Sequence, residues 1–280
     1  MMDPRYRWEE ITYDNIQPLI AEYPNYVPES LQALEEARWN TIPETLSQRK
    51  KTGKAYLELD EVVQLVEWKL KHGTFRPTLL SLIKSNPPST IHSTTTLAFQ
   101  TPTEVSSALT HLTSLRGIGP ATASLLLSCY NPTSVPFFSD ELYRWLHYED
   151  DDDDDDGGGE KGKGKGKGKG WERKMKYTVK EYESLYERAR EVVGRIGKVE
   201  GREVGMGELE KGAWVLGRRR GVVVGGKGGD VGSKVETGGE ERGMGKAGKE
   251  REVKGAVRER KRKVEGEDTG GRRSLRRRKG

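Results

Sequence analysis

Cysteine is almost absent from this 280-residue chain. Cys129 is the single one, which excludes an internal disulfide and any zinc or iron–sulfur site built from several cysteines. Hydrophobic residues are also scarce, at 32%, too few for one continuous core through a chain of this length. Alternating strand patterns are nearly absent, and no apolar run approaches the roughly 18 residues of a membrane helix. We therefore expect a helical protein with no membrane partner.

Charge and glycine are concentrated in two segments. The whole chain carries 49 Lys+Arg and 44 Asp+Glu, a net charge of +5. Residues 218–280 alone hold 21 Lys+Arg against 10 Asp+Glu, whereas residues 149–170 hold an Asp150–Asp156 run and a Gly-Lys repeat. Both segments are too poor in apolar residues to offset the entropy of ordering them. The rest of the chain is nearly neutral and has an ordinary globular composition.

These shifts predict one helical domain with an internal insertion. Residues 1–148 form its first part, 149–170 a disordered insertion, 171–217 the closing helices, and 218–280 a disordered basic tail. Apolar residues at helical spacing indicate the individual helices. They predict helices over Leu57–His72, from near Pro77, around Val105–Leu112, over Ala121–Cys129, and, after the insertion, around Tyr182–Ile196 and Leu209–Leu216. The predicted fold class is all-α.

One short motif carries chemical information. Residues 115–123 read LRGIGPATA and join two predicted helices. Gly117 and Gly119 allow backbone dihedrals closed to other residues, and Ile118 can fill the space between the helices. The backbone N–H groups at the start of the second helix then point outward, ready for an anion such as a DNA phosphate.

This motif resembles the hairpin of the helix-hairpin-helix DNA glycosylase superfamily. Gly117 and Gly119 match the hairpin glycines, and Thr122 matches the threonine on the second helix. In that superfamily a catalytic aspartate follows some twenty residues later, which corresponds to Asp140, with Arg144 one turn beyond. The resemblance covers about residues 108–145. A second segment, residues 66–77, looks like one in uncharacterised eukaryotic proteins that share the hairpin.

The resemblance implies a glycosylase-like helical fold and a monofunctional DNA N-glycosylase reaction. Asp140 would stabilise the positive charge that develops as the N-glycosidic bond breaks. Ala121 stands where bifunctional members carry a nucleophilic lysine, so Schiff-base strand cleavage is not expected. No cofactor is implied: an iron–sulfur cluster is excluded, and only a monovalent cation at the hairpin is compatible with the motif. The implied DNA contacts are Gly117, Ile118, Gly119, Thr122 and Arg144.

Each of these interpretations has a plainer alternative. Asp140 could be a helix N-cap, and the hairpin could be an ordinary turn between two helices. Lys69 and Arg76 could contact phosphates, but a solvated surface position is the interpretation that their charge favours. The histidines show no metal-ligand spacing. Four aromatic residues are more typical of a hydrophobic core than of a surface that stacks on a base: Trp68, Phe137, Phe138 and Trp214.

The tail contains two basic clusters typical of a nuclear localisation signal. They comprise Arg260, Lys261, Arg262 and Lys263, and then Arg276, Arg277, Arg278 and Lys279. The expected partners are DNA and the nuclear import machinery, and the expected location is the nucleus. The sequence leaves the oligomeric state open. The competing hypothesis is a non-catalytic helical module that binds DNA or another protein.

Overall fold

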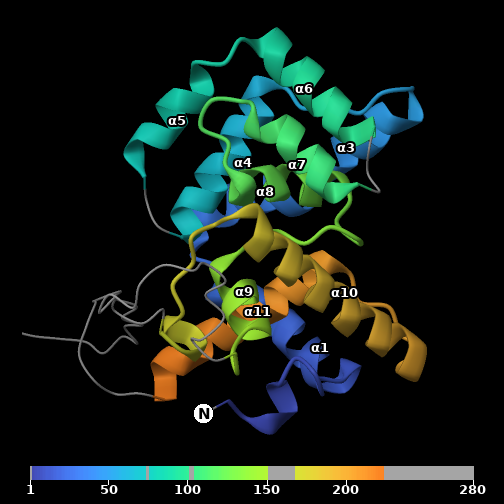
Figure 1. Ribbon diagram of the computed structural model, residues 1–280, viewed down its shortest axis with the longest axis vertical. Coiled ribbons are helices and arrows are strands. Elements are labelled where there is room, and N and C mark those ends of the chain that lie inside the picture. Colours follow the sequence, from blue (N-terminus) through green and yellow to red (C-terminus); the bar gives the residue numbers. More distant parts are fainter. Residues whose placement is uncertain (1, 74–75, 101–103, 151–167, 224–280) are drawn as a thin grey trace, which may run out of the picture. The chain divides into compact units, whose positions relative to one another are not determined.

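All regular secondary structure in the described part of the chain is helical, which confirms the predicted all-α class. The computed structural model describes residues 2–73, 76–100, 104–150 and 168–223 (Figure 1). The α-helices are α1 (Tyr13–Glu22), α2 (Gln32–Glu36), α3 (Ile42–Lys51), α4 (Leu59–His72), α5 (Pro77–Lys84), α6 (Pro88–Gln100), α7 (Val105–Thr113), α8 (Pro120–Tyr130), α9 (Asp140–Leu146), α10 (Val179–Glu200) and α11 (Met206–Val223). Four 3₁₀ turns and one π-helical turn accompany them within these ranges: η1 (Pro4–Tyr6), η2 (Tyr23–Tyr26), η3 (Glu29–Leu31), the π-helical η4 (Ala37–Thr41) and η5 (Gly170–Glu172).

Local capping explains where two amphipathic helices, α4 and α10, begin and end. Glu58 and Glu61 form a reciprocal capping box at the start of α4, which stops at Gly73. Thr178 and Glu181 do the same for α10. That helix ends at Gly201, whose φ of +64° lies in the left-handed region that glycine tolerates best. The capping residues therefore set the length of both helices.

The six helices expected from apolar spacing are all present, as α4, α5, α7, α8, α10 and α11. The N-terminal helices and α6 were not predicted. Helix α6 nevertheless buries Ile91, Thr95, Ala98 and Phe99, a helical spacing that its serines and threonines obscure because their intrinsic helix propensity is low. Cys129 is buried in α8.

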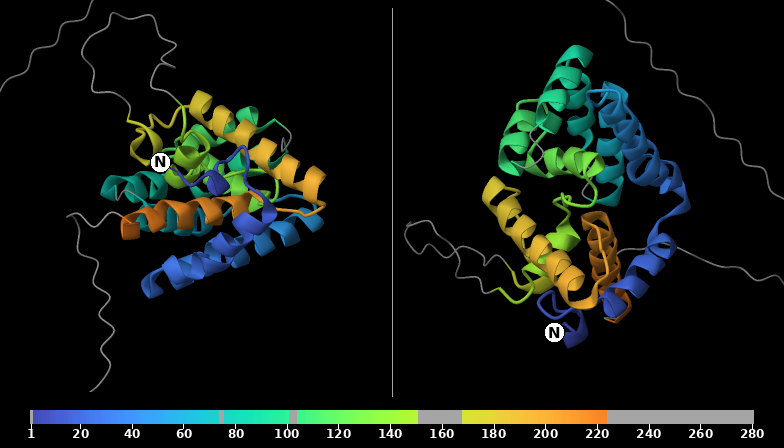
Figure 2. Two further views of the ribbon diagram at one scale, coloured as in Figure 1. Left: turned by 90° about the horizontal axis from the view of Figure 1, so that it is seen from below. Right: turned by 90° about the vertical axis from the view of Figure 1, so that its right-hand side faces the viewer.

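The helices form two groups, and helix α8 of one group packs against α10 of the other. One group contains α3 to α8, and the other contains α1, α9, α10 and α11 (Figures 1 and 2). The continuous run α2–η4–α3 links them, and its π-helical turn carries the fully buried Arg38. One cluster of buried hydrophobic side chains extends through both groups. Among the described residues no helix is both long and apolar enough to span a membrane.

Both expected segment boundaries need correction. Asp150, assigned to the insertion, is held in place because its carboxylate lies 2.9 Å from Arg188 Nη1 and its carbonyl accepts from Arg173. Helix α11 continues to Val223, past the expected start of the tail at residue 218, because Leu216 still packs in the core and Arg219 pairs with Glu22 at 2.6 Å. Residues 168–170 of the expected insertion are also described, and Gly170 is buried at the start of η5. Residues 151–167 and 224–280 lie outside the described residues.

Candidate functional site

A cleft of about 530 Å³ lies between the two groups of helices. One wall comes from α4 and from the turn between α7 and α8, and the other from the start of α9, the segment before α10, and α11. The hairpin residues Gly117, Gly119 and Thr122 and the aspartate Asp140 all line this cleft. The structure thus brings together the two halves of the sequence motif, which lie about twenty residues apart in the chain.

The two hairpin glycines occupy different environments. Gly117 has a φ of +80°, and a Cβ added there would lie 3.0 Å from Ile83 Cγ1, so both its dihedral and its packing require glycine. Gly119 has ordinary extended dihedrals, and an added Cβ would meet no atom within 4 Å. The open space in front of Gly119 leaves room for a ligand to approach the backbone.

The hairpin turn is fixed by a residue that the sequence did not single out. The side chain of Asn86, only 5% exposed, pairs with the backbone of Arg116 in both directions. Its Nδ2 donates to Arg116 O and its Oδ1 accepts from Arg116 N, each at 2.9 Å. The sequence gives no sign of this contact, because Asn86 lies just after α5 and approaches Arg116 only in the folded protein.

The turn presents unpaired donors at the start of α8. Within the described ranges, the N–H groups of Gly117, Gly119 and Ala121 meet no acceptor. Ile118 and Thr122 are both buried, at 5% and 2% exposure, so a ligand at this face would meet backbone rather than these side chains. Three free N–H groups at a helix N-terminus form a surface suited to an anion.

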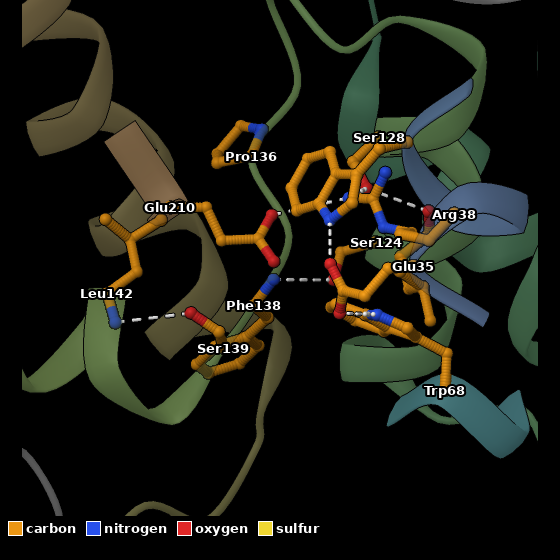
Figure 3. A network of polar contacts seen from close by, with 12 residues as sticks. Glu35, Arg38, Trp68, Ser124, Ser128, Pro136, Phe138, Ser139, Leu142 and Glu210 are labelled. Atoms are coloured by element: carbon orange, nitrogen blue, oxygen red, sulfur yellow. Dashed lines mark hydrogen bonds and ion pairs between the residues drawn. The ribbon is translucent and has the colours of Figure 1, made fainter. Parts of the chain in front are cut away.

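Asp140 is the first residue of α9 and not its N-cap. Ser139 caps the helix, its Oγ accepting from Leu142 N at 3.2 Å (Figure 3). The Asp140 side chain is 32% exposed and lines the cleft. The N-cap role, which was the plainer alternative for Asp140, therefore belongs to Ser139.

The segment that carries Asp140 is tied to the second hairpin helix. Ser124 Oγ on α8 accepts from Phe138 N at 2.9 Å, as Figure 3 shows, and Ser124 is fully buried. Tyr182 Oη on α10 donates to Pro136 O at 3.1 Å. Because these bonds hold the approach to α9 from both sides, the position of Asp140 is fixed relative to the hairpin.

Two side chains contact the carboxylate of Asp140. Tyr177 Oη donates to Asp140 Oδ1 at 2.8 Å, and burial together with the charge of Asp140 raises the pKa of Tyr177. Arg144 Nη2 lies 3.4 Å from Asp140 Oδ2, and Arg144 Nε donates to Arg173 O at 2.9 Å. Arg144, expected as a DNA contact, is thus held beside the aspartate and does not line the cleft.

The structure places Lys69 and Arg76 in the cleft wall. Arg76 is exposed there, in agreement with its interpretation as a solvated surface charge, but the same interpretation is wrong for Lys69. Lys69 is partly buried. Burial, reinforced by the positive charge of Arg76 and opposed by Asp140, lowers the pKa of Lys69 to about 8. Glu141 also lines the cleft, and burial raises the pKa of its carboxyl. Lys69 and Glu141 are therefore more shielded from water than charged residues on an open surface.

Glu35, which the sequence did not single out, organises the aromatic floor of the cleft. Its carboxylate accepts from Trp68 Nε1 at 2.7 Å (Figure 3). It also accepts from Trp39 Nε1 and Tyr23 Oη, each at 2.8 Å. His72 Nε2 lies 2.7 Å from Glu35 Oε1. Although burial raises it, the pKa of Glu35 is lowered on balance by His72 and by these hydrogen bonds.

A second buried pair lies beside this floor. Arg38 Nη2 contacts Ser128 Oγ at 2.8 Å and Glu210 Oε2 at 3.3 Å, as Figure 3 shows. The Arg38 guanidinium also lies over the ring of Trp39, 4.2 Å from its centroid. Burial raises the pKa of Glu210, and the charge of Arg38 opposes that shift. Glu210 lines the cleft from α11, so this pair joins the linking helix to both groups of helices.

The aromatic residues expected in the core are indeed buried, but they also line the cleft. Phe137, Phe138, Trp68 and Trp214 are between 1% and 9% exposed. The Nε1 donor of Trp214 is buried without an acceptor within the described part of the chain. No group of histidine, cysteine and acidic residues that could hold a metal occurs among the described residues.

Comparison with family models, curated proteins and solved structures gave no match to this chain. The fold and the site define the class on their own: an all-helical protein in which a helical hairpin and an aspartate on the following helix share one cleft. The basic clusters proposed as a localisation signal lie outside the described residues.

Proposed function

We propose that the protein binds DNA through the α7–α8 hairpin and hydrolyses the N-glycosidic bond of a nucleotide flipped into the cleft. The observation that carries the proposal is the shared cleft: the open face of Gly119 and the carboxylate of Asp140 line the same cavity. A base-excising enzyme needs this arrangement, because the strand must be held while the extruded nucleotide reaches the catalytic group.

The hairpin supports the binding half of the proposal. The unpaired N–H groups around Gly119 suit a phosphate oxygen, and such contacts hold a duplex without reading its sequence. Arg116, also in the turn, has an exposed side chain, and its Nη1 lies 3.5 Å from Ser85 Oγ, a long contact that the side chain can leave to reach a second phosphate. The α7–α8 turn would thus bind one strand through its backbone N–H groups and the charge of Arg116.

The cleft supports the catalytic half. Its volume of about 530 Å³ falls in the range of small-molecule sites, roughly 300–1,000 Å³. Trp68, Phe137 and Trp214 give it aromatic walls for a base, and Trp214 Nε1 is a buried donor without a partner. Asp140 would stabilise charge at C1′ and orient water as the bond to the base breaks. The proposal also includes a nuclear location, to which the import signal in the tail would direct the protein.

Two substitutions test binding and catalysis separately. Gly119→Ala adds a methyl group in open space at dihedrals that alanine accepts, so the protein should stay folded and bind duplex DNA more weakly. Gly194→Ala, also in open space but on α10, is the matched control. Asp140→Asn should keep binding and abolish base release across a panel of damaged duplexes.

The results also distinguish the competing function. Binding that Gly119→Ala leaves unchanged would move the DNA contact away from the hairpin. Base release that survives Asp140→Asn would remove the assigned role of the aspartate. DNA binding through Gly119 with no base release from any duplex would favour a non-catalytic DNA-binding module.

A further inference from the structure

Three side chains on α11 line the cleft in a row, and the proposed reaction leaves their polar groups without a role. Glu210, Trp214 and Arg218 lie four residues apart, so they project from one face of the helix, and all three border the cavity. Glu210 and Trp214 are buried, whereas Arg218 is exposed. The row therefore offers an acceptor, a donor and a positive charge in that order along the wall.

The indole N–H of Trp214 needs an acceptor. Its Nε1 is buried and meets no acceptor among the described residues. The ring is held from two sides, because the His72 ring centroid lies 4.9 Å from its centroid and Arg218 Cζ lies 4.0 Å from it. A buried donor without a partner is costly, and a ligand that brings an acceptor removes that cost. The cleft therefore favours a ligand with an acceptor at Trp214.

One turn earlier on α11, Glu210 has the opposite requirement. Its Oε2 lies 3.3 Å from Arg38 Nη2, and its Oε1 accepts no hydrogen bond from the described residues (Figure 3). An ionised carboxylate can only accept, so Oε1 needs a donor. Side chains four residues apart on a helix have Cβ atoms roughly 5–6 Å apart. One planar ligand can therefore meet the donor of Trp214 and the acceptor of Glu210 together.

The contact between α11 and α9 orients this pair relative to the reacting carbon. A Cβ added to Gly217 would lie 2.7 Å from Glu141 Cγ, so α11 passes close to the start of α9, where Asp140 precedes Glu141. Gly217 follows Trp214 by about 4.5 Å along the helix axis and Glu210 by about 10.5 Å. A base whose sugar lies at Asp140 therefore reaches Trp214 first and meets Glu210 with its far end.

We propose that Glu210 and Trp214 read the edge of the flipped base and select an exocyclic amino group beside an unprotonated ring nitrogen, the edge that adenine and cytosine share. The amino group, far from C1′, donates to Glu210, and the ring nitrogen accepts from Trp214 Nε1. Hypoxanthine and uracil have similar shapes but present a carbonyl oxygen and a ring N–H at these places, so both contacts are lost. The selection rests on the proposed function, and the lower cost of extruding a mismatched or damaged base supplies further discrimination.

The test measures binding of the full chain to duplexes with one target nucleotide opposite a tetrahydrofuran residue, so that no target base is paired. A 2′-fluoroarabino sugar at the target suppresses base release during the measurement. At pH 8 the carboxylate of Glu210 is mostly ionised, because burial raises its pKa to about 7 and no further. We expect at least roughly tenfold tighter binding of adenine than of hypoxanthine, and of cytosine than of uracil.

Trp214→Phe and Glu210→Gln should bring both ratios of affinities close to one, because phenylalanine lacks the N–H and glutamine can donate as well as accept. Trp8→Phe and Glu208→Gln are the matched controls, since neither residue lines the cleft, and both should keep the ratios. A duplex with tetrahydrofuran at the target position has no base to read, so its binding is the folding control for every variant.

Equal affinities in the unaltered protein, or a preference for hypoxanthine and uracil, overturn the inference. Preferences that persist in both cleft variants do the same. These results leave the proposed function standing, because it depends on binding at Gly119 and on base release by Asp140. Should one cleft variant bind the baseless duplex poorly, the other variant and the ratios of the unaltered protein decide. Failure to bind any duplex overturns both proposals together.

Discussion

Tyr177 has a backbone conformation that residues other than glycine rarely adopt. Its φ of +56° places it in the left-handed region, at a cost of roughly 1–2 kcal/mol. Its surroundings compensate: the hydroxyl donates to Asp140 and the guanidinium of Arg76 lies 5.8 Å from the ring centroid. The ring also packs 5.7 Å from Phe138. Strain held in place by such contacts is typical of functional sites, where it aims a side chain.

Tyr177→Phe should therefore weaken the site more than the fold. The change removes the hydrogen bond to Asp140 and leaves the ring in place, so the free energy of unfolding should fall by only about 1 kcal/mol. Base release attributed to Asp140 should slow roughly tenfold, the equivalent of about 1.4 kcal/mol in the barrier. Single-turnover rates and urea denaturation measure the two effects.

Tyr186→Phe is the matched control, because the Tyr186 hydroxyl on α10 has no hydrogen bond within the described residues. Equal rates for Tyr177→Phe and Tyr186→Phe would show that the hydroxyl does not orient Asp140. A loss of stability with an unchanged rate for the folded protein would assign Tyr177 to folding alone.

Four helical elements meet at one carboxylate. Glu35 on α2 accepts from Tyr23 in η2, Trp39 in η4 and Trp68 in α4, and α4 also supplies His72. The π-helical turn η4 that follows α2 inserts a residue into the helix and so changes the direction in which the next side chains point. The bond network therefore fixes α4, and with α4 the cleft wall that carries Lys69.

Glu35→Gln should destabilise the protein and change its response to acid. The amide keeps one acceptor oxygen and turns two donors toward N–H groups, so the loss should be about 2–3 kcal/mol near neutral pH. The pKa of Glu35 is lowered in the fold from its ordinary value of 4.5. Its contribution is therefore complete above that value and is lost as the pH falls below it.

Unfolding measured by urea titration at several pH values tests this prediction. The difference in stability between the unaltered protein and Glu35→Gln should be constant at neutral pH and shrink below about pH 4.5. Glu36→Gln is the control on the same helix, because Glu36 is exposed and accepts from the exposed amide of Asn40. A difference in stability that stays constant as the pH falls below about 4.5 would contradict a charged Glu35 in the folded protein.

The elements themselves were predictable where one face repeats with helical spacing. Helices α4 and α10 follow directly from their buried apolar residues, and each ends at a glycine. Asp140 and the hairpin could be selected as site candidates from local residue types. Asn86 and Glu35 could not, because their partners lie on other elements and no local pattern records such contacts. Lys69 was misjudged for the same reason: a charged residue on a helix is normally solvated, and only the tertiary fold buries it.

At the scale of the whole molecule, charge and site are carried by different parts of the chain. The cleft contains acidic and basic side chains in similar number, so it offers no broad field for a polyanion. The excess of Lys and Arg belongs to the tail, residues 218–280. The described residues all belong to one compact unit, which contains the whole cleft. Affinity for DNA in general and action on one nucleotide should therefore be separable.

Neutralising the two tail clusters should reduce nonspecific DNA binding without changing the chemistry in the cleft. The change replaces with glutamine, in the full chain, the eight residues Arg260, Lys261, Arg262, Lys263, Arg276, Arg277, Arg278 and Lys279. Each phosphate contact contributes a slope of about 0.9 to the dependence of log affinity on log salt, so the slope should decrease by up to about 7. Titrations of undamaged duplex at several salt concentrations measure it.

Gly119→Ala in the same assay gives the opposite signature, and this contrast makes the experiment decisive. That variant should lose affinity while keeping nearly the full salt slope, because it removes contacts made by uncharged backbone donors. The tail variant should keep the ratio of affinities for an abasic and an intact duplex, since this preference belongs to the cleft. A tail variant with an unchanged slope would place the electrostatic contacts on the helical unit, where Arg76, Arg116 and Arg218 would be the next residues to substitute.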